Sequence, residues 1–113
     1  MDCLFCKIAE GKIPAQKVFE DGDIIAFRDI NPQAPTHILL VPRRHITTLN
    51  DLLPTDAVLV GKLVLQAKVL AEQEAIAPGG YRTVFNCNRD GGQSVYHIHL
   101  HLLGGRALHW PPG

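Results

Sequence analysis

Three histidines alternate with apolar residues near the end of the chain, in the run VYHIHLHLL at residues 95–103. Side chains on a β-strand point alternately to its two faces, so a strand here would put His97, His99 and His101 on one face, about 6.5–7 Å apart along the strand. Three imidazoles in register are costly to bury when their ring nitrogens have no partners. The run therefore favours a chemical role over a purely structural one.

Two kinds of chemistry are open to these histidines. Histidines two residues apart on a strand can hold a catalytic metal, which also needs a third protein ligand and an open coordination position. Alternatively, neutral imidazole is a nucleophile and a proton carrier near pH 7, so one histidine could attack phosphorus while its neighbours manage charge.

The loop directly before the histidines, DGGQS at residues 90–94, favours a phosphate ligand. Gly91 and Gly92 allow a close approach of the backbone, and successive amide N–H groups can form an anion-binding nest. A plain hairpin turn would use the same glycines. Near the histidines the sequence offers only Asp90 as a carboxylate, and it has no P-loop motif, which argues against a magnesium-assisted kinase or pyrophosphatase.

The cysteines suggest a second site. Cys3 and Cys6, in CLFC, have the spacing of half a zinc site, which needs two further ligands. Idle thiols and a redox pair are the alternatives, although a thioredoxin-like motif would follow a strand in a βαβ unit, which is not predicted here. Cys87 is interpreted as a small apolar filler of a strand. An odd number of cysteines fits a reducing compartment.

The elements that must position these residues are mainly strands. Runs rich in β-branched and aromatic residues predict strands at 17–21, 23–29, 36–42, 81–87 and 94–103. Apolar residues at three- and four-residue spacing predict one long amphipathic helix over 54–77, and the apolar start of the chain predicts a short N-terminal helical turn. Because one long helix cannot supply the crossovers of a parallel sheet, we expect an α+β fold with an antiparallel sheet of about five strands in a single domain, 1–113.

Charge and hydropathy restrict the partners. Eleven basic residues balance eleven acidic ones, so the chain lacks the electropositive surface that a nucleic-acid polymer or an anionic membrane would require. The sequence has no apolar run of 18 residues and no basic start followed by an apolar stretch, so we expect neither membrane insertion nor export. These features predict a cytoplasmic protein.

Two blocks of the sequence resemble a known family. HIHLHLL resembles the histidine-triad motif, His-x-His-x-His-x-x with apolar x, of the histidine-triad superfamily. Its context, DGGQSVYHIHLHLLGGRALHWPPG, and the earlier block FRDINPQAPTHILLVPRRHI are similar to the Hint branch, the histidine-triad nucleotide-binding proteins. The resemblance covers almost the whole chain.

The resemblance implies catalytic roles. His99 would be the nucleophile that attacks the α-phosphorus and carries a transient nucleotidyl group, and His101 would hold a non-bridging phosphate oxygen. Ser94 would lie near the leaving group. His97 is the first member of the triad, and His37 matches a histidine behind the triad that assists its orientation.

The resemblance also implies a nucleotide pocket. Asp29 would bind the ribose hydroxyls, although from the residues alone a turn cap is the ordinary explanation. Trp110 would reach the partner subunit's site, unless it simply covers an apolar patch of its own subunit. The base and sugar would contact Phe5, Ile8, Phe27, Ile30 and Leu39, and the phosphate and sugar would contact Asn86, Gly92, Gln93, Ser94, Val95, His99 and His101.

Zinc and a homodimer are further implications. His45 and His97 match the positions that complete a Cys2His2 site with Cys3 and Cys6 in zinc-bearing relatives; such a zinc would be structural, and catalysis would require no cofactor. The expected partners are a purine nucleotide substrate and a second copy of the chain, whose sheet would join this one.

Four functions remain open at this point. The first is hydrolysis of nucleoside 5′-phosphoramidates, or of aminoacyl adenylates, to the nucleoside monophosphate through a nucleotidyl-histidine intermediate. The second is hydrolysis of dinucleoside polyphosphates, against which the GGRALHWPPG ending argues. The third is a nucleotide-binding regulatory or scaffold protein with incidental hydrolysis. The fourth is a metal-dependent hydrolase that uses the triad as ligands.

Overall fold

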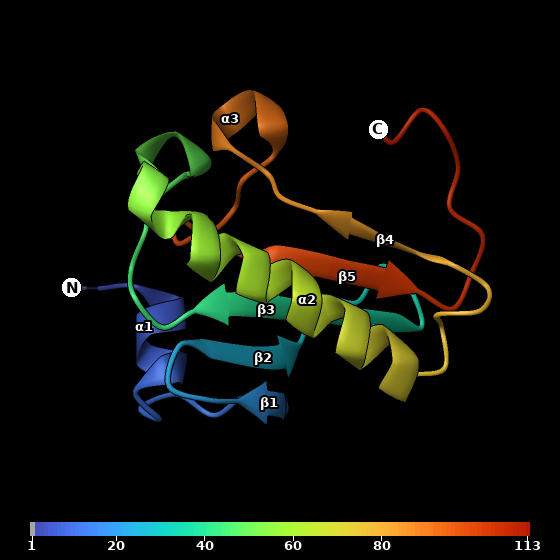
Figure 1. Cartoon of the computed structure of the whole chain (residues 1–113), viewed down its shortest axis with the longest axis horizontal. Coiled ribbons are helices and arrows are strands. Elements are labelled where there is room, and N and C mark those ends of the chain that lie inside the picture. The colour runs from blue at the N-terminus through green and yellow to red at the C-terminus, as the bar shows by residue number, and fades with distance from the viewer. Residues whose placement is uncertain (1) are drawn as a thin grey trace.

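A five-stranded antiparallel sheet runs through the part of the chain that the computed structural model describes, residues 2–113 (Figure 1). Its strand order is β1-β2-β3-β5-β4. The elements are α1 (Leu4–Ala9), β1 (Lys17–Glu20), β2 (Ile24–Arg28), β3 (Thr36–Pro42), the 3-10 turns η1 (Leu49–Asp51) and η2 (Pro54–Asp56), α2 (Ala57–Gln73), β4 (Tyr81–Val84), α3 (Asn88–Gly91) and β5 (Leu100–Gly104).

The long helix α2 crosses one face of the sheet and builds the larger core (Figure 1). Its buried side chains recur at three- and four-residue spacing, which is the period of a helix face. No helix within residues 2–113 is long and apolar enough to cross a membrane. The buried residues of this core are Ile24, Ala26, Ile38, Leu40, Leu63, Ala67, Leu70, Ala71, Ile76, Leu100 and Leu102.

The opposite face of the sheet carries a second, smaller core around α1. Phe5 and Ile8 of α1 pack there with alternate residues of β2 and β3, including Phe27 and Leu39. Strands β2 and β3 are thus apolar on both faces, which explains the uninterrupted apolar run at 38–41. Since His37 alternates with core residues of the α2 side, its ring lies on the α1 side.

The fold class predicted from the sequence is confirmed, and the bounds of the long helix and of the last two strands are corrected. The helix starts at Ala57, because Pro54–Asp56 forms a 3-10 turn, and it ends at Gln73 instead of residue 77. At this end Ala75 adopts a left-handed φ of 59°, and the N–H of Ile76 donates to the carbonyl of Ala71 at 3.0 Å, as in a Schellman motif.

The last strand is the second correction. The alternating pattern predicts a strand over 94–103, but β5 begins at Leu100. Before that point the N–H of Ile98 donates to the carbonyl of Ile46 at 2.8 Å, so this segment is attached to the loop after β3. The loop expected at 88–93 contains the single-turn helix α3, and β4 stops at Val84 instead of residue 87.

Candidate active site

A cavity of about 360 Å³ opens on the α1 side of the sheet. Its wall is mostly apolar, and the polar groups that reach it include Asp29, Ser94, His99 and His101. An apolar cavity with a few converging polar side chains is the usual form of a small-molecule site. The lining residues are Leu4, Phe5, Ile8, Ile13, Pro14, Ala15, Gln16, Phe27, Arg28, Asp29, Ile30, Leu39, Ser94, Val95, His99 and His101.

His99 presents a ring nitrogen with a free electron pair. Its Nδ1 lies 2.8 Å from the backbone carbonyl oxygen of His97. A carbonyl oxygen only accepts, so Nδ1 carries the proton and donates, and in the neutral ring Nε2 is left unprotonated. The edge-on ring of Phe5, with centroids 5.0 Å apart, packs against this imidazole and helps to fix its plane.

A hydrogen-bonded chain fixes His101 in the opposite tautomer. The backbone N–H of Gln33 donates to Nδ1 of His37 at 3.1 Å, so His37 must carry its proton on Nε2. Nε2 of His37 lies 2.9 Å from Nδ1 of His101 and donates to it. His101 is then protonated at Nε2 and is a donor to a ligand in the cavity, while His99 is an electron-pair donor.

Burial keeps these three imidazoles neutral. It lowers the pKa of His101 from the ordinary 6.5 to about 4, with further lowering by His99 and His37. Burial also lowers the pKa of His99 and of His37, in spite of the opposing influence of Asp29. Neutrality matters because a protonated imidazole has no electron pair with which to attack or accept.

The two carboxylate oxygens of Asp29 have different surroundings. One carboxylate oxygen accepts the N–H of Asn31 at 2.8 Å, which is the turn cap considered as the alternative from sequence. The other lies 3.5 Å from Nε2 of His37, farther than the His101 nitrogen that takes the His37 proton. Because Asp29 also lines the cavity, this second oxygen is available to a ligand.

Asp29, His37 and His101 also lie close enough to suggest a metal site, since their potential ligand atoms are within 4.8 Å of one another. The hydrogen bonds argue against it. A metal bound at Nε2 of His37 would put the proton on Nδ1, where it would oppose the N–H of Gln33. The geometry therefore favours hydrogen bonding between these imidazoles over a bound metal ion, and it argues against a metal-dependent hydrolase at the triad.

Most residues predicted for the nucleotide pocket do line the cavity. These are Phe5, Ile8, Phe27, Asp29, Ile30, Leu39, Ser94, Val95, His99 and His101. The segment from Ile13 to Gln16, before β1, also lines the cavity and was not predicted from the sequence. Leu4 and Arg28 were missed as well, although each is the sequence neighbour of a predicted contact.

Four predicted contacts are not among the cavity-lining residues: Asn86, Gly92, Gln93 and Trp110. The Gln93 side chain is buried and bonds the backbone instead, because its Oε1 accepts the N–H of Asn88 at 2.9 Å and its Nε2 donates to the carbonyls of Thr47 and Val95. It secures the loop that presents Ser94. Trp110 is 83% exposed in the C-terminal segment.

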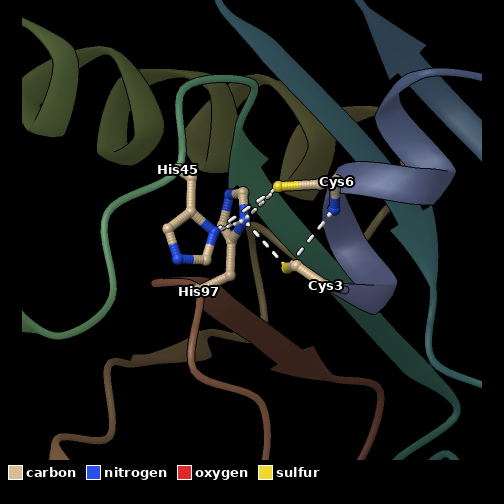
Figure 2. Close-up of side chains that lie close together, drawn as sticks. All are labelled: Cys3, Cys6, His45 and His97. Carbon is tan, nitrogen blue, oxygen red and sulfur yellow. Dashed lines mark hydrogen bonds between the residues drawn. The ribbon is translucent and has the colours of Figure 1, made fainter. Parts of the chain in front are cut away.

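The prediction that three imidazoles share one site is also wrong for His97. This ring is fully buried and belongs to a separate cluster with Cys3, Cys6 and His45 (Figure 2). His99 directly precedes β5 and its ring still reaches the cavity with that of His101, but strand alternation does not extend back to His97, because the residues before Leu100 do not form a strand. What His97 gives the cavity is its backbone carbonyl, the acceptor for His99.

The separations in this second cluster fit a tetrahedral metal. Nδ1 of His97 lies 3.4 Å from Sγ of Cys3, 3.6 Å from Sγ of Cys6 and 3.2 Å from Nδ1 of His45. Sγ of Cys6 lies 3.4 Å from Nδ1 of His45. Zinc bonds of about 2.3 Å to sulfur and 2.0–2.1 Å to nitrogen give tetrahedral edges of about 3.5 Å for S–N and 3.3 Å for N–N. These four separations therefore match zinc without rearrangement.

The remaining ring nitrogens support the same interpretation. Nε2 of His97 donates to the carbonyl of Pro42 at 2.7 Å, which leaves the Nδ1 electron pair directed at the cluster. Nε2 of His45 lies 3.3 Å from Oγ1 of Thr47. In Figure 2 both rings and both sulfurs point toward one another, from the α1 end and from the loops after β3 and before β5.

The five-stranded sheet, the apolar cavity and the oriented histidines are shared with a known family, to which the chain belongs. The family model described as "Scavenger mRNA decapping enzyme C-term binding" matches residues 2–108. Together with the relatives below, it identifies the chain as a member of the histidine-triad (HIT) superfamily, of the Hint-like branch.

Particular relatives support this assignment. A purine nucleoside phosphoramidase of Escherichia coli is 50% identical over 107 residues, which cover 95% of this chain and 90% of that protein. An uncharacterised HIT-like protein of Synechococcus elongatus is 50% identical over 112 residues, or 99% and 97% of the two chains. The crystal structure of a HIT family hydrolase from Legionella pneumophila superposes with a TM-score of 0.98 at 60% identity and covers 99% of this chain and 100% of that one.

The assigned tautomers and pKa shifts give a first prediction. We expect nitrogen NMR to show the proton of His99 on Nδ1 and that of His101 on Nε2, with the pKa of His101 at about 4 and the pKa of His99 below its ordinary 6.5. The unfolded chain binds a proton at His101 near pH 6.5 but the folded chain only near pH 4, so the free energy of unfolding should fall as pH is lowered through that interval. His101 titrating at 6.5 or above would contradict the assignment.

Proposed function

We propose that this chain hydrolyses nucleoside 5′-phosphoramidates, such as adenosine 5′-phosphoramidate, and aminoacyl adenylates to the nucleoside monophosphate. The observation that carries the proposal is the pair of opposite tautomers in one cavity, with an electron pair on His99 and an N–H on His101. The 50% identity to a purine nucleoside phosphoramidase supports the reaction class and a purine nucleotide as substrate. The apolar cavity wall suits a base and a sugar.

The reaction has two displacement steps at phosphorus. Nε2 of His99 attacks the α-phosphorus, the phosphorus–nitrogen bond of the substrate breaks, and the leaving amine takes a proton from a water molecule through the Ser94 hydroxyl. The hydroxide formed from that water then attacks the same phosphorus, the bond to Nε2 breaks, and the monophosphate leaves with neutral His99 regenerated. The carbonyl of His97 stabilises the positive charge that the phosphorylated ring carries between the steps.

His101 and Asp29 bind the parts of the substrate that do not react. The Nε2–H of His101 donates to a non-bridging phosphate oxygen, and this bond strengthens as negative charge develops. The second carboxylate oxygen of Asp29 accepts from a ribose hydroxyl. Two alternatives are kept: hydrolysis of dinucleoside polyphosphates, and nucleotide binding for regulation with incidental hydrolysis. A comparison of kcat/KM for a diadenosine polyphosphate and for adenosine phosphoramidate separates them.

Replacement of His99 tests the covalent step. We expect His99→Ala to reduce kcat for adenosine phosphoramidate by at least about 10³-fold, since the nucleophile is lost, while the Kd for AMP changes little. Rapid quenching of the wild-type protein, followed by mass spectrometry, should find an AMP adduct on His99. Turnover by His99→Ala at the wild-type rate would rule out the mechanism.

We also propose that zinc occupies the Cys3, Cys6, His45 and His97 cluster as a structural ion with four protein ligands. Thiols free to bind zinc agree with a cytoplasmic location, which we propose as well. Elemental analysis of protein purified without added metal should find about one zinc per chain, against none for Cys3→Ser/Cys6→Ser. Cys87→Ser is the matched control, because this cysteine lies outside the cluster. Equal zinc contents in all three proteins would refute the site.

A homodimer through β4 completes the proposal. Both edges of the sheet are open within residues 2–113, but β1 carries a register shift near Lys17, an irregularity that discourages pairing. Beside β4 lies the C-terminal segment, held by a bond from Arg82 to the carbonyl of His109 at 2.7 Å. A second copy paired at β4 would therefore meet the segment that carries the exposed Trp110.

Light scattering tests the dimer. We expect the mass of two chains for the wild type and of one chain for Thr83→Asp, because symmetric pairing at β4 puts like charges opposite or diagonal to each other. Lys17→Asp, on the other edge strand, should remain dimeric. A monomeric wild type, or a monomer produced by the β1 variant alone, would contradict pairing through β4.

A further inference from the structure

The short helix α1 belongs to both sites at once. Leu4, Phe5 and Ile8 form part of the cavity wall. Cys6, on the same six-residue helix, and Cys3, its N-cap, supply both sulfurs of the metal cluster. A displacement of α1 therefore changes the two sites together.

The metal cluster offers the N-terminal end of α1 an attachment besides the packing of Phe5 in the smaller core. An isolated helix of six residues is far below the length that is stable in water. Its last turn is held by Arg43, whose Nη1 donates to the carbonyl of Ala9 at 2.9 Å. Its first turn has no acidic side chain, and the N–H of Cys6 reaches only the sulfur of Cys3, at 3.5 Å. Two bonds from sulfur to a metal would fix this turn against His45 and His97.

The same ion also reaches the reactive histidine. The ring of His97 would bind the metal, and its backbone carbonyl accepts the Nδ1–H of His99. Phe5, between the two cysteines in sequence, packs its ring edge-on against His99 at 90°. The hydrogen bond from His99 to His97 and the contact between Phe5 and His99 are both short and join buried residues.

We propose that the metal and the nucleotide bind cooperatively, because the metal holds α1 in the position in which it completes the nucleotide cavity. The inference rests on the proposed nucleotide function and on the zinc site. Cys6 and His45 are then positioning residues for the nucleotide, although neither touches the site at which it reacts. By linkage, the factor by which zinc tightens AMP binding must equal the factor by which AMP tightens zinc binding.

Calorimetry with AMP tests this coupling. The Kd for AMP should rise about 5- to 150-fold when zinc is removed by a chelator, and it should return to its first value when zinc is restored. Zinc affinity, measured by competition with a chelating dye, should increase by the same factor when AMP is saturating. Equal AMP affinities in the two forms, or a wild-type protein that binds no zinc, would overturn the inference.

Variants of His45 separate positioning from general folding. His45→Ala removes a ligand outside the cavity and should weaken AMP binding. His45→Cys keeps four ligands, three cysteines and one histidine, and should restore AMP binding. Hydrogen exchange should show the α1 amides losing protection in the zinc-free protein while the β3 amides keep theirs. If the metal-free protein unfolds altogether, the test is the rate at which the folded wild type releases zinc. This rate should fall when AMP is added, and an unchanged rate would overturn the proposal.

These outcomes also distinguish the inference from the function on which it depends. Failure of the zinc-loaded protein to bind AMP would refute the proposed function. AMP binding of equal strength with and without zinc would leave that function intact and refute only the coupling. Cys87→Ser is the thiol control and should show the same coupling as the wild type, because its sulfur is not part of the cluster.

Discussion

The active cavity depends on the direction in which two backbone groups point. The N–H of Gln33 can only donate, and the carbonyl of His97 can only accept, so one fixes the proton of His37 and, through it, that of His101, while the other fixes the proton of His99. Two chemically identical side chains in one cavity thereby acquire opposite properties. One ring presents an electron pair to a ligand, and its neighbour presents an N–H.

This division holds only while the rings are neutral, and burial provides the neutrality. A charged imidazole would lose its hydration in the apolar cavity, which is why the pKa of His101 lies as low as about 4. Burial alone would be destabilising if ring nitrogens had no partners. Within the part of the chain that the structure describes, every fully buried side-chain nitrogen or oxygen has a hydrogen-bond partner, so the polar atoms are buried without that penalty.

The sequence predicts the site where the backbone is regular and fails where it is not. Strand alternation correctly directs Leu100 and Leu102 to the α2 core and His101 to the opposite face, because β5 is a regular strand from Leu100 onward, and it still holds for His99 directly before the strand. The same rule misassigns His97, which precedes the strand. No local pattern marks the attachment of residue 98 to the loop after β3, since that contact depends on a segment about 50 residues away.

Other parts of the site depend on the resemblance or escape prediction. The CxxC spacing identifies Cys3 and Cys6 as possible ligands, but their partners His45 and His97 come from distant loops and followed only from the family. Gln93 was expected at the nucleotide, yet its amide satisfies three backbone groups, two near it in sequence and one in the loop after β3. A glutamine beside a glycine-rich loop could contact a nucleotide or bond the backbone. Only the packing of the segments around Thr47 and Asn88 decides between these roles.

The irregular segment before β5 explains why the two sites lie so close together. A regular strand from residue 94 would have placed the His97 ring beside His99 over the cavity, with its carbonyl committed to a neighbouring strand. The bend instead turns the ring toward the cysteines and leaves the carbonyl free to accept from His99. The departure from the strand pattern is thus what allows one residue to belong to the metal cluster through its side chain and to the cavity through its backbone.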